Sequence, residues 1–192
     1  MKLRMNHITE NSHIYGFEPT FTIWTQGCSI RCKNCWNKFT WDPKKGYDIE
    51  VDDLIEKFLE SGNNCITILG GEPLDQEEAV LELITKIKKL EKGVILYTGR
   101  EKYQISEKAM EVISKTVDIL ISGPYVDELR TTSHQMIGST NQKIENLTDR
   151  YDLKDLYNGT VVEIDFNEDT AAIDIMGYPE EFLGDDFKPE GY

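Results

Sequence analysis

Three of the four cysteines of this 192-residue chain lie within eight residues, at Cys28, Cys32 and Cys35. They directly follow an apolar segment, residues 21–24, and barrel-type folds place their chemistry in loops at the ends of strands. Spacings of three and two residues let one loop surround a single metal centre without backbone strain. Clustered thiolates of this kind are typical ligands of zinc and of iron–sulfur clusters.

Several metal and redox sites could use such a loop. A structural zinc site would need a fourth Cys or His nearby, and the nearest candidates, His13 and Cys65, are remote. A thioredoxin-like dithiol could use Cys32 and Cys35 but would leave the first cysteine unexplained. A c-type haem would need a histidine where a tryptophan stands, and the Cys-Pro ending of bacterial ferredoxin motifs is absent. Three thiolates are one ligand short for a 4Fe–4S cluster, which leaves either a distant fourth ligand or an open iron that can bind a small molecule.

Composition excludes two classes of function. The 21 basic and 35 acidic residues give a net charge of −14, which argues against a nucleic-acid binder that relies on phosphate contacts. No run of about 18 apolar residues exists, so we expect no membrane span. The start of the chain lacks the apolar core of a signal peptide, and the cysteines are clustered, so we expect a cytoplasmic protein in a reducing compartment.

The charges are unevenly distributed along the chain. Residues 19–41 contain no acid, and three bases, Arg31, Lys33 and Lys38, surround the cysteines there. Residues 161–192 hold ten acids and one base. A positive surface around the cysteine loop of an acidic protein would suit an acidic electron donor, although a solvated basic loop explains the same pattern.

Apolar segments of strand and helix type alternate up to residue 125. Asp75 is placed to cap the second helix, with Glu78 completing a capping box. A loop follows each strand and helices separate most strands, which is typical of parallel βα units. The chain is too short for eight units, so we expect an α/β fold with an incomplete parallel (β/α) barrel. The expected strands are residues 21–25, 65–69, 94–97 and 117–121, after a short leading strand within 1–15, and the expected helices are residues 51–59, 75–90 and 106–115.

The C-terminal part follows a different pattern. Residues 160–165 and 171–175 alternate in hydrophobicity around a polar turn, which predicts a β-hairpin. We expect a core domain over residues 1–145 and a C-terminal extension with the hairpin and an acidic tail over residues 146–192, both in one compact unit. The last residues, about ten of them, are expected to be mobile.

The C-x3-C-x2-C loop after a first strand resembles the cluster motif of radical S-adenosylmethionine (SAM) enzymes. The resemblance implies an incomplete barrel of the radical SAM type and a 4Fe–4S cluster held by Cys28, Cys32 and Cys35. It also implies that SAM occupies the fourth iron. Cys65 lies inside an apolar strand, where a free cysteine is usually a small buried hydrophobic residue.

A second motif stands at the end of the second of these expected strands. Gly70 and Gly71 would let the backbone approach a ligand closely, and Glu72 could accept a hydrogen bond from an ammonium group. Together with Pro73 they resemble the GGEP stretch that holds the methionine amino group of SAM in radical SAM enzymes. We therefore expect Glu72 to serve the ligand rather than the fold, although Gly-Gly turns are common in any protein.

Three further positions are candidates for SAM contacts. Thr98 and Gly99 occupy the equivalent place after the third strand and would suit a ribose, although an ordinary turn has the same composition. Trp36 could stack on adenine or anchor its own loop. Residues 122–124 could line the adenosyl pocket. No histidine stands in a catalytic pattern, and we assign no catalytic residue beyond these cofactor ligands.

A longer resemblance covers residues 15–145, about two thirds of the chain. It runs through Gln26-Gly27-Cys28, Cys35-Trp36-Asn37 and the segments 123–130 and 138–142, which are similar to the activating enzymes of anaerobic ribonucleotide reductase, a group of glycyl radical activases. The chain departs from that group at residues 16–19, where a Gly-Pro-Gly stretch is usual, and at Asn34, where an aromatic residue is common. The C-terminal hairpin is additional.

The resemblance implies reductive cleavage of SAM to methionine and a 5′-deoxyadenosyl radical. This radical would take a hydrogen atom from a backbone glycine of anaerobic ribonucleotide reductase, with a reduced flavodoxin or ferredoxin as the electron donor. A radical SAM enzyme that modifies a small peptide or nucleotide would carry the same motifs. A non-catalytic iron–sulfur electron-transfer or binding module would instead need a fourth protein ligand and would not turn over SAM.

Overall fold

The computed structural model describes residues 1–156, 159, 161–167 and 172–177, and its central element is a seven-stranded sheet. The strand order across the sheet is β3-β1-β2-β4-β5-β6-β7. The strands are β1 (Lys2–Ser12), β2 (Thr20–Thr25), β3 (Tyr47–Glu50), β4 (Cys65–Gly70), β5 (Gly93–Thr98), β6 (Ile119–Ser122) and β7 (Lys143–Asn146).

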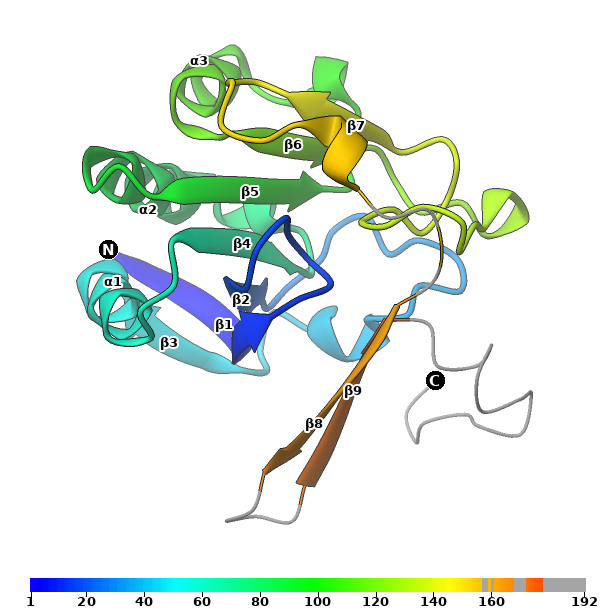
Figure 1. The fold of residues 1–192 in the computed structure, drawn as a ribbon, viewed down its shortest axis with the longest axis horizontal. Coiled ribbons are helices and arrows are strands. Elements are labelled where there is room, and N and C mark those ends of the chain that lie inside the picture. The colour runs from blue at the N-terminus through cyan, green and yellow to red at the C-terminus, as the bar shows by residue number, and fades with distance from the viewer. Residues whose placement is uncertain (157–158, 160, 168–171, 178–192) are drawn as a thin grey trace.

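Four neighbouring strands of this sheet, β2, β4, β5 and β6, run parallel to one another. Three helices connect or flank them: α1 (Val51–Glu60), α2 (Glu77–Lys89) and α3 (Glu107–Thr116). Because the carboxyl ends of parallel strands meet at one edge, the loops that follow these strands gather there, at the end to which the strand arrows point in Figure 1. The predicted α/β class with an incomplete parallel barrel is confirmed. Four of the seven strands of this sheet are parallel neighbours, and the antiparallel strands β1 and β7 flank them on both sides.

The helices cover one face of the sheet and form the main core. Ile66 and Ile68 of β4 point to this face, and Phe58 of α1 meets Phe21 of β2 edge to face at 5.7 Å. Ser106 caps α3 by accepting a hydrogen bond from the Ala109 amide. The predicted cap of α2 is wrong: Asp75 lies in a short 3-10 helix, η2 (Pro73–Gln76), and α2 begins after Gln76 without a side-chain cap.

The opposite face of the sheet carries the alternate residues of the same strands and is covered by irregular chain. Ile95, Ile119 and Ile121 pack there against Met136 and Ile137, which belong to the chain after β6. A second apolar cluster on this face contains Trp24 of β2 and Leu69 of β4. This face therefore forms the inside of the incomplete barrel.

Three strands differ from the sequence prediction. The leading strand is much longer than expected, since β1 has 11 residues and pairs with both β2 and β3. Neither β3 nor β7 was expected. Both have four residues, most of them polar, and lie at the edges of the sheet, where backbone pairing rather than an apolar pattern defines a strand.

The predicted C-terminal hairpin is confirmed. It consists of β8 (Val162–Asn167) and β9 (Ala172–Gly177), paired from Val162–Gly177 to Asn167–Ala172. The centre of its turn and the tail expected to be mobile lie outside the described residues. No helix of the described part is long and apolar enough to cross a membrane.

Candidate functional site

The cysteine loop leaves the carboxyl end of β2 and is closed at its base by backbone hydrogen bonds. The Gly27 amide donates to the Thr40 carbonyl at 2.7 Å, and the Cys28 amide donates to the Trp41 carbonyl at 3.2 Å. Arg31 and Asn34 both have positive φ, so the backbone turns sharply twice between the first and the last cysteine. The loop thus returns to its starting point and keeps the three cysteines on one short arc.

All three thiols of the loop are half-buried and their sulfurs face backbone amides. The Asn37 amide donates to Cys35 Sγ at 3.4 Å, the Tyr125 amide donates to Cys32, and the Ile30 and Arg31 amides donate to Cys28. Burial raises the pKa of the Cys28 and Cys32 thiols, and repulsion from the neighbouring thiols adds to this while the amide donors oppose it.

This donor set fits a metal centre with several positive charges. Among the described residues, no three Cys, His, Asp or Glu side chains already stand in an arrangement that could hold a metal ion. Cys35 nevertheless lies close enough to Cys28 and Cys32 to raise the pKa of both thiols, and bound iron would remove that repulsion. Amide hydrogen bonds to sulfur are one of the ways in which proteins tune iron–sulfur clusters. We therefore take the loop as the cofactor-binding element.

The fourth cysteine lies elsewhere. Cys65 begins β4, whereas the cysteine loop follows the opposite end of the neighbouring parallel strand β2. Five residues of strand, about 17 Å, separate these two levels of the sheet. Cys65 is fully buried, and burial raises its pKa to about 12. A cluster on the loop therefore leaves Cys65 out.

The two glycines of the GGEP stretch are required by the chain itself. Gly70 has φ +115°, and a Cβ there would lie 2.4 Å from the Thr25 nitrogen. A Cβ on Gly71 would lie 2.1 Å from the Gly27 oxygen. The amides of Gly71 and Glu72 donate to the carbonyls of Thr25 and Gly27, both at 2.9 Å. The end of β4 is thus joined to the base of the cysteine loop, with no room for side chains between them.

Glu72 is fully buried and its carboxylate is held by three donors. It accepts hydrogen bonds from Thr98 Oγ1 at 2.7 Å, from the Gly99 amide at 2.8 Å and from the Leu74 amide at 3.0 Å. Burial raises the pKa of Glu72, and these hydrogen bonds oppose the shift. The structure therefore brings together Glu72, Thr98 and Gly99, as the sequence suggested, but it corrects the expectation that Glu72 does not serve the fold.

The cysteine loop also covers this carboxylate. A Cβ on Gly99 would lie 2.7 Å from Ile30 Cδ1, so the Ile30 side chain sits directly over the end of β5. Pro73 begins η2 and is buried behind Glu72. The predicted SAM contacts of this stretch therefore lie immediately below the cysteine loop rather than in an open cavity.

Asp75 and Arg100 form a second link between the strand ends and the loop, and sequence reasoning missed it. Asp75 accepts hydrogen bonds from the Ser29 amide and from Ser29 Oγ, both at 2.7 Å. Arg100 donates to Asp75 Oδ1, the oxygen that also accepts from Ser29 Oγ, at 3.0 Å and lies 4.0 Å from Glu72. Only the spacing to Glu78 gave a local signal for Asp75, and that signal pointed to a helix cap.

A third set of contacts holds the far side of the loop, at the short helix η4 (Asp127–Leu129). Lys33 forms an ion pair with Glu128 at 3.0 Å, and the side-chain amide of Asn34 donates to the Asp127 carboxylate at 2.6 Å. The Arg130 guanidinium lies over the Trp36 ring, 5.4 Å from its centroid. Trp36 therefore contributes to the anchoring of its own loop.

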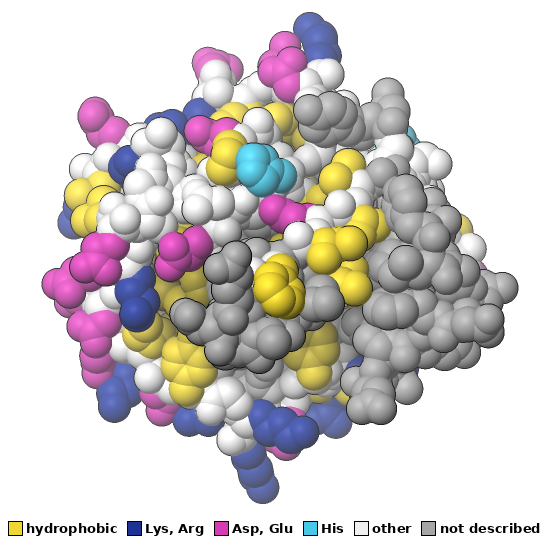
Figure 2. Space-filling model, turned by 60° about the horizontal axis from the view of Figure 1, so that its bottom comes forward, with side chains coloured by type: hydrophobic (Ala, Val, Ile, Leu, Met, Phe, Trp, Pro, Cys, Tyr) yellow, Lys and Arg dark blue, Asp and Glu magenta, His cyan; other side chains and the backbone are white. Residues whose placement is uncertain are grey.

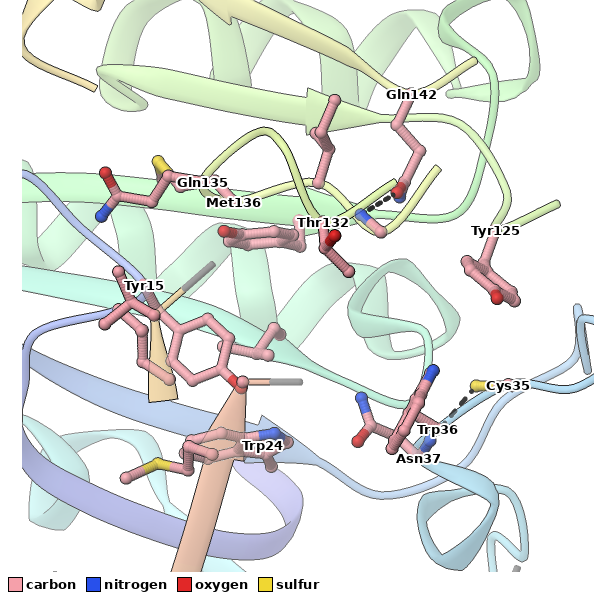
Figure 3. Close-up of a pocket in the computed structure, with 18 of the residues that line it drawn as sticks. Tyr15, Trp24, Cys35, Trp36, Asn37, Tyr125, Thr132, Gln135, Met136 and Gln142 are labelled. Carbon is pink, nitrogen blue, oxygen red and sulfur yellow. Dashed lines mark hydrogen bonds between the residues drawn. The ribbon is translucent and has the colours of Figure 1, made fainter. Parts of the chain in front are cut away.

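A pocket of about 410 Å³ opens beside the loop on the inner face of the sheet (Figure 3). Cys35, Trp36 and Asn37 line one side of it, and Tyr15 and Trp24 lie across from them. Gln142 and Thr132 close the side toward β6. Ile175, Met176 and Gly177 of β9 also line the pocket. Of the predicted site residues, Cys35 and Trp36 line this pocket, whereas Glu72, Thr98 and Gly99 do not.

Comparison with known proteins identifies similar sequences for most of the chain. Residues 16–145 match the model of a family described as "4Fe-4S single cluster domain". An anaerobic ribonucleoside-triphosphate reductase-activating protein of Enterobacteria phage T4 is 31% identical over 134 residues, which cover 66% of this chain and 83% of the phage protein. The protein of the same name from Vibrio cholerae is 27% identical over 136 residues, 66% of this chain and 87% of that protein.

The fold is also similar to that of a solved structure. QueE from Escherichia coli superposes with a TM-score of 0.50 and 18% identity. The match covers 66% of this chain, which spans 61% of the QueE chain. The likeness concerns the arrangement of the sheet and helices. The hairpin β8–β9 lies beyond the residues matched by the family model.

Proposed function

The chain belongs to the 4Fe–4S single cluster domain family within the radical SAM superfamily, as an enzyme of the activating type, and we propose that it generates a glycyl radical on an anaerobic ribonucleoside-triphosphate reductase. The observation that carries the proposal is the set of three amide-bonded thiols on one loop, beside a pocket whose wall includes Cys35 and Trp36. The names of the two relatives supply the partner.

The cofactor ligands follow from the donor set. Cys28, Cys32 and Cys35 would hold a 4Fe–4S cluster, and the chemistry supplied by this cluster with SAM is one-electron cleavage of a carbon–sulfur bond to a 5′-deoxyadenosyl radical. The chain's own contribution is to orient and to exclude water. Trp24, Leu69 and Tyr97 form an apolar and aromatic floor for the pocket, and the volume of about 410 Å³ suits a small molecule or a few residues of a polypeptide.

The GGEP stretch is proposed to bind the methionine part of SAM. Gly70, Gly71, Glu72 and Pro73 lie directly below the cysteine loop, and Thr98 and Gly99 already contact the Glu72 carboxylate. An ammonium group could reach that carboxylate only if Ile30 moves from its position over Gly99. This supports a site that forms as the cysteine loop adjusts to its cofactor.

The electron donor is proposed to be an acidic protein of the flavodoxin or ferredoxin type. Arg31 on the cysteine loop is exposed, and Lys38 follows shortly after the last cysteine. Lys33 is also exposed, but its charge is partly neutralised by Glu128. An acidic donor would approach the loop more favourably than the rest of this acidic chain.

The experiment that tests the function uses reconstituted enzyme, SAM, a reductant and the reductase from the same organism. The proposal predicts a carbon-centred doublet in the electron paramagnetic resonance spectrum that disappears when the acceptor glycine of the reductase is replaced by alanine. SAM cleavage without such a radical, accompanied by hydrogen transfer from a small peptide or nucleotide, would favour modification of that molecule instead. A cluster without SAM cleavage would favour a non-catalytic iron–sulfur module.

A further inference from the structure

The C-terminal hairpin is joined to the body of the protein near the beginning of β8 and the end of β9. Glu163 of β8 accepts a hydrogen bond from Ser12 Oγ at 2.9 Å and from the His13 amide at 3.1 Å. Met176 of β9 pairs with Glu163 and is only 7% exposed. The end of β1 and the turn after it therefore hold this part of the hairpin in place.

Met176 covers part of the inner face of the sheet. It packs in one cluster with Trp24 of β2 and Leu69 of β4. The Trp24 ring also stacks on His7, with the ring centroids 4.1 Å apart, and Tyr15 meets it edge to face at 5.4 Å. With these neighbours Trp24 is only 2% exposed. A shorter side chain at position 176 would therefore uncover part of the Trp24 ring.

The same part of the hairpin is a wall of the pocket beside the cysteine loop. Residues 161 and 175–177 line this pocket together with Cys35 and Trp36. The hairpin lies beyond residues 16–145, which match the family model. Figure 2, which brings the bottom of Figure 1 forward, shows hydrophobic side chains on the side of the molecule from which the hairpin projects. The extension thus adds an apolar wall to the candidate site.

The lining of the pocket favours an uncharged occupant. Among the described residues that line it, none is Asp, Glu, Lys or Arg, and the only titratable side chains besides cysteine and tyrosine are His7 and His134. The phosphates of a nucleotide are usually bound by Arg, Lys or a helix N-terminus. Apolar and aromatic walls with a few amide groups, such as those of Asn37 and Gln142, suit an uncharged polypeptide segment better.

A closed wall matters for hydrogen transfer to a radical. The transfer breaks the Cα–H bond of the acceptor glycine, forms a C–H bond of 5′-deoxyadenosine and leaves the unpaired electron on the glycine. If the acceptor is misplaced, or if solvent enters, the buffer or the reductant can supply the hydrogen atom instead. That side reaction still produces 5′-deoxyadenosine but no glycyl radical. The number of glycyl radicals per 5′-deoxyadenosine therefore reports how well the pocket holds the acceptor.

We propose that Met176 is a positioning residue for this transfer, and that the hairpin, held by Glu163, is the wall that keeps an uncharged glycine segment of the partner in the pocket. This inference rests on the proposed function and adds a residue outside the family model to the site. Met176 acts through its packing against Trp24, which fixes the shape of the pocket floor.

The main test counts glycyl radicals by electron paramagnetic resonance and 5′-deoxyadenosine by chromatography in one reaction of reconstituted enzyme, SAM, a reductant and the reductase. Met176→Ala should lower the ratio of the two products about tenfold, because the acceptor is no longer held in place. Met176→Leu, which has a similar volume, should keep the ratio within about twofold of wild type. Met110→Ala is the matched control, since Met110 packs in the core on the helix-covered face, and it should keep the ratio as well.

The attachment of the hairpin is tested without any cofactor. In the chain before reconstitution, Glu163→Ala should raise the hydrogen-exchange rate of the His13 amide about fivefold or more, because this amide loses its acceptor. Glu10→Ala, at an exposed position of β1, removes the same charge and should leave the rate unchanged. After reconstitution, Glu163→Ala should also lower the ratio of glycyl radical to 5′-deoxyadenosine.

The outcomes separate this inference from the function on which it rests. If Met176→Ala keeps the wild-type ratio, even with less of both products, Met176 only supports the fold and the inference is wrong while the function stands. An equal fall in Met110→Ala would contradict it in the same way. A higher ratio in Met176→Ala or Glu163→Ala would make the hairpin a cover that hinders the partner and would overturn the proposal. If wild type cleaves SAM but forms no glycyl radical, the proposed function is wrong, and this inference fails with it.

Discussion

The cysteine loop is held on two sides by contacts of different kinds. On the side of the strand ends, the loop is tied by backbone hydrogen bonds to Gly71 and Glu72 and by the two bonds from Ser29 to Asp75. On the side of η4, it is tied by an ion pair and a hydrogen bond between exposed side chains, Lys33 with Glu128 and Asn34 with Asp127. In the first set Glu72 is fully buried and the Asp75 side chain is 23% exposed, whereas in the second set Lys33 and Glu128 are 73% and 66% exposed.

This difference indicates which part of the loop is fixed. Backbone hydrogen bonds and contacts to the less exposed carboxylates respond less to salt, while exposed ion pairs contribute little and are screened. Cys28 stands beside the fixed end, and Cys32 and Cys35 stand on the part supported by η4. We therefore expect the loop to adjust to a cofactor mainly on the η4 side, with the strand ends serving as a rigid base.

The largest expected effect comes from the thiols themselves. Replacing Cys28, Cys32 or Cys35 by alanine should each remove most of the iron bound after anaerobic reconstitution, because a three-thiolate site cannot lose a ligand. Cys65→Ala is the matched control: it should lower thermal stability, since Cys65 is fully buried, but leave the iron content unchanged. Iron and sulfide analysis checks this, and loss of iron in Cys65→Ala would contradict the assignment.

Glu72→Gln should have the next largest effect, and it directly tests the contacts on the strand side of the cysteine loop. Glutamine keeps the shape of the side chain but replaces one carboxylate oxygen by an NH2 group. Each oxygen accepts a hydrogen bond from a backbone amide, one from Leu74 and one from Gly99, so the NH2 group faces a donor in either orientation. We expect a loss of about 1–3 kcal/mol in the free energy of unfolding. Urea unfolding measures it, with Glu56→Gln on the exposed face of α1 as the control.

The same variant separates the two roles of Glu72. If Glu72 also binds the amino group of SAM, SAM affinity should fall at a temperature where the variant is fully folded. A variant that loses stability but binds SAM like wild type would leave Glu72 with its structural role alone. Unchanged stability would instead contradict the contacts seen at the end of β5.

Asp75→Asn is expected to have a moderate effect on the same side. The amide can still accept one hydrogen bond from Ser29, but it loses its charge opposite Arg100. A cost of about 1 kcal/mol follows, since Asp75 is only partly buried. The more specific expected result is that the reconstituted variant loses iron to a chelator faster than wild type, because Ser29 adjoins Cys28. Asp149→Asn, at an exposed position, is the control, and equal rates of iron loss would argue against a positioning role.

Much of the fold could be read from the sequence because its signals are local. The strand at residues 65–69 and the helix at residues 51–59 follow from apolar runs and helical periodicity. The three-cysteine loop needs only the spacing of its ligands. In contrast, β7 is short and polar, and it exists because β6 offers an edge for pairing. No local pattern marks such a strand.

The site was predictable in its residues but not in its contacts. Glu72 meets Thr98 because β4 and β5 are parallel neighbours in the register Cys65–Gly93, and this register depends on the whole sheet. Asp75 shows the competition between local and distant partners. Its spacing suits a helix cap, yet Ser29, 46 residues away, takes both of its oxygens. Long-range partners of this kind decide the geometry of the loop.

The smallest effect is expected on the η4 side. Glu128→Gln removes the partner of Lys33, but both side chains are mostly exposed, so the melting temperature should change by only about 1 °C or less. The Lys33 ammonium holds the pKa of Glu128 below its usual value of 4.5. A carboxyl whose pKa is lowered by folding stabilises the protein above its unfolded pKa and loses that contribution as the pH falls.

The difference in melting temperature between wild type and Glu128→Gln should therefore be greatest near neutral pH and low salt. It should shrink as the pH falls below 4.5 and disappear once the pH is below the lowered pKa of Glu128, or at about 1 M salt. Scanning calorimetry at these conditions measures it. The strand-side variant Asp75→Asn provides the comparison, because its cost should respond less to salt. If Glu128→Gln destabilised the protein as much as Glu72→Gln, the two sides of the loop would be equally firm. The cysteine loop would then be held rigidly on both sides rather than at the strand ends alone.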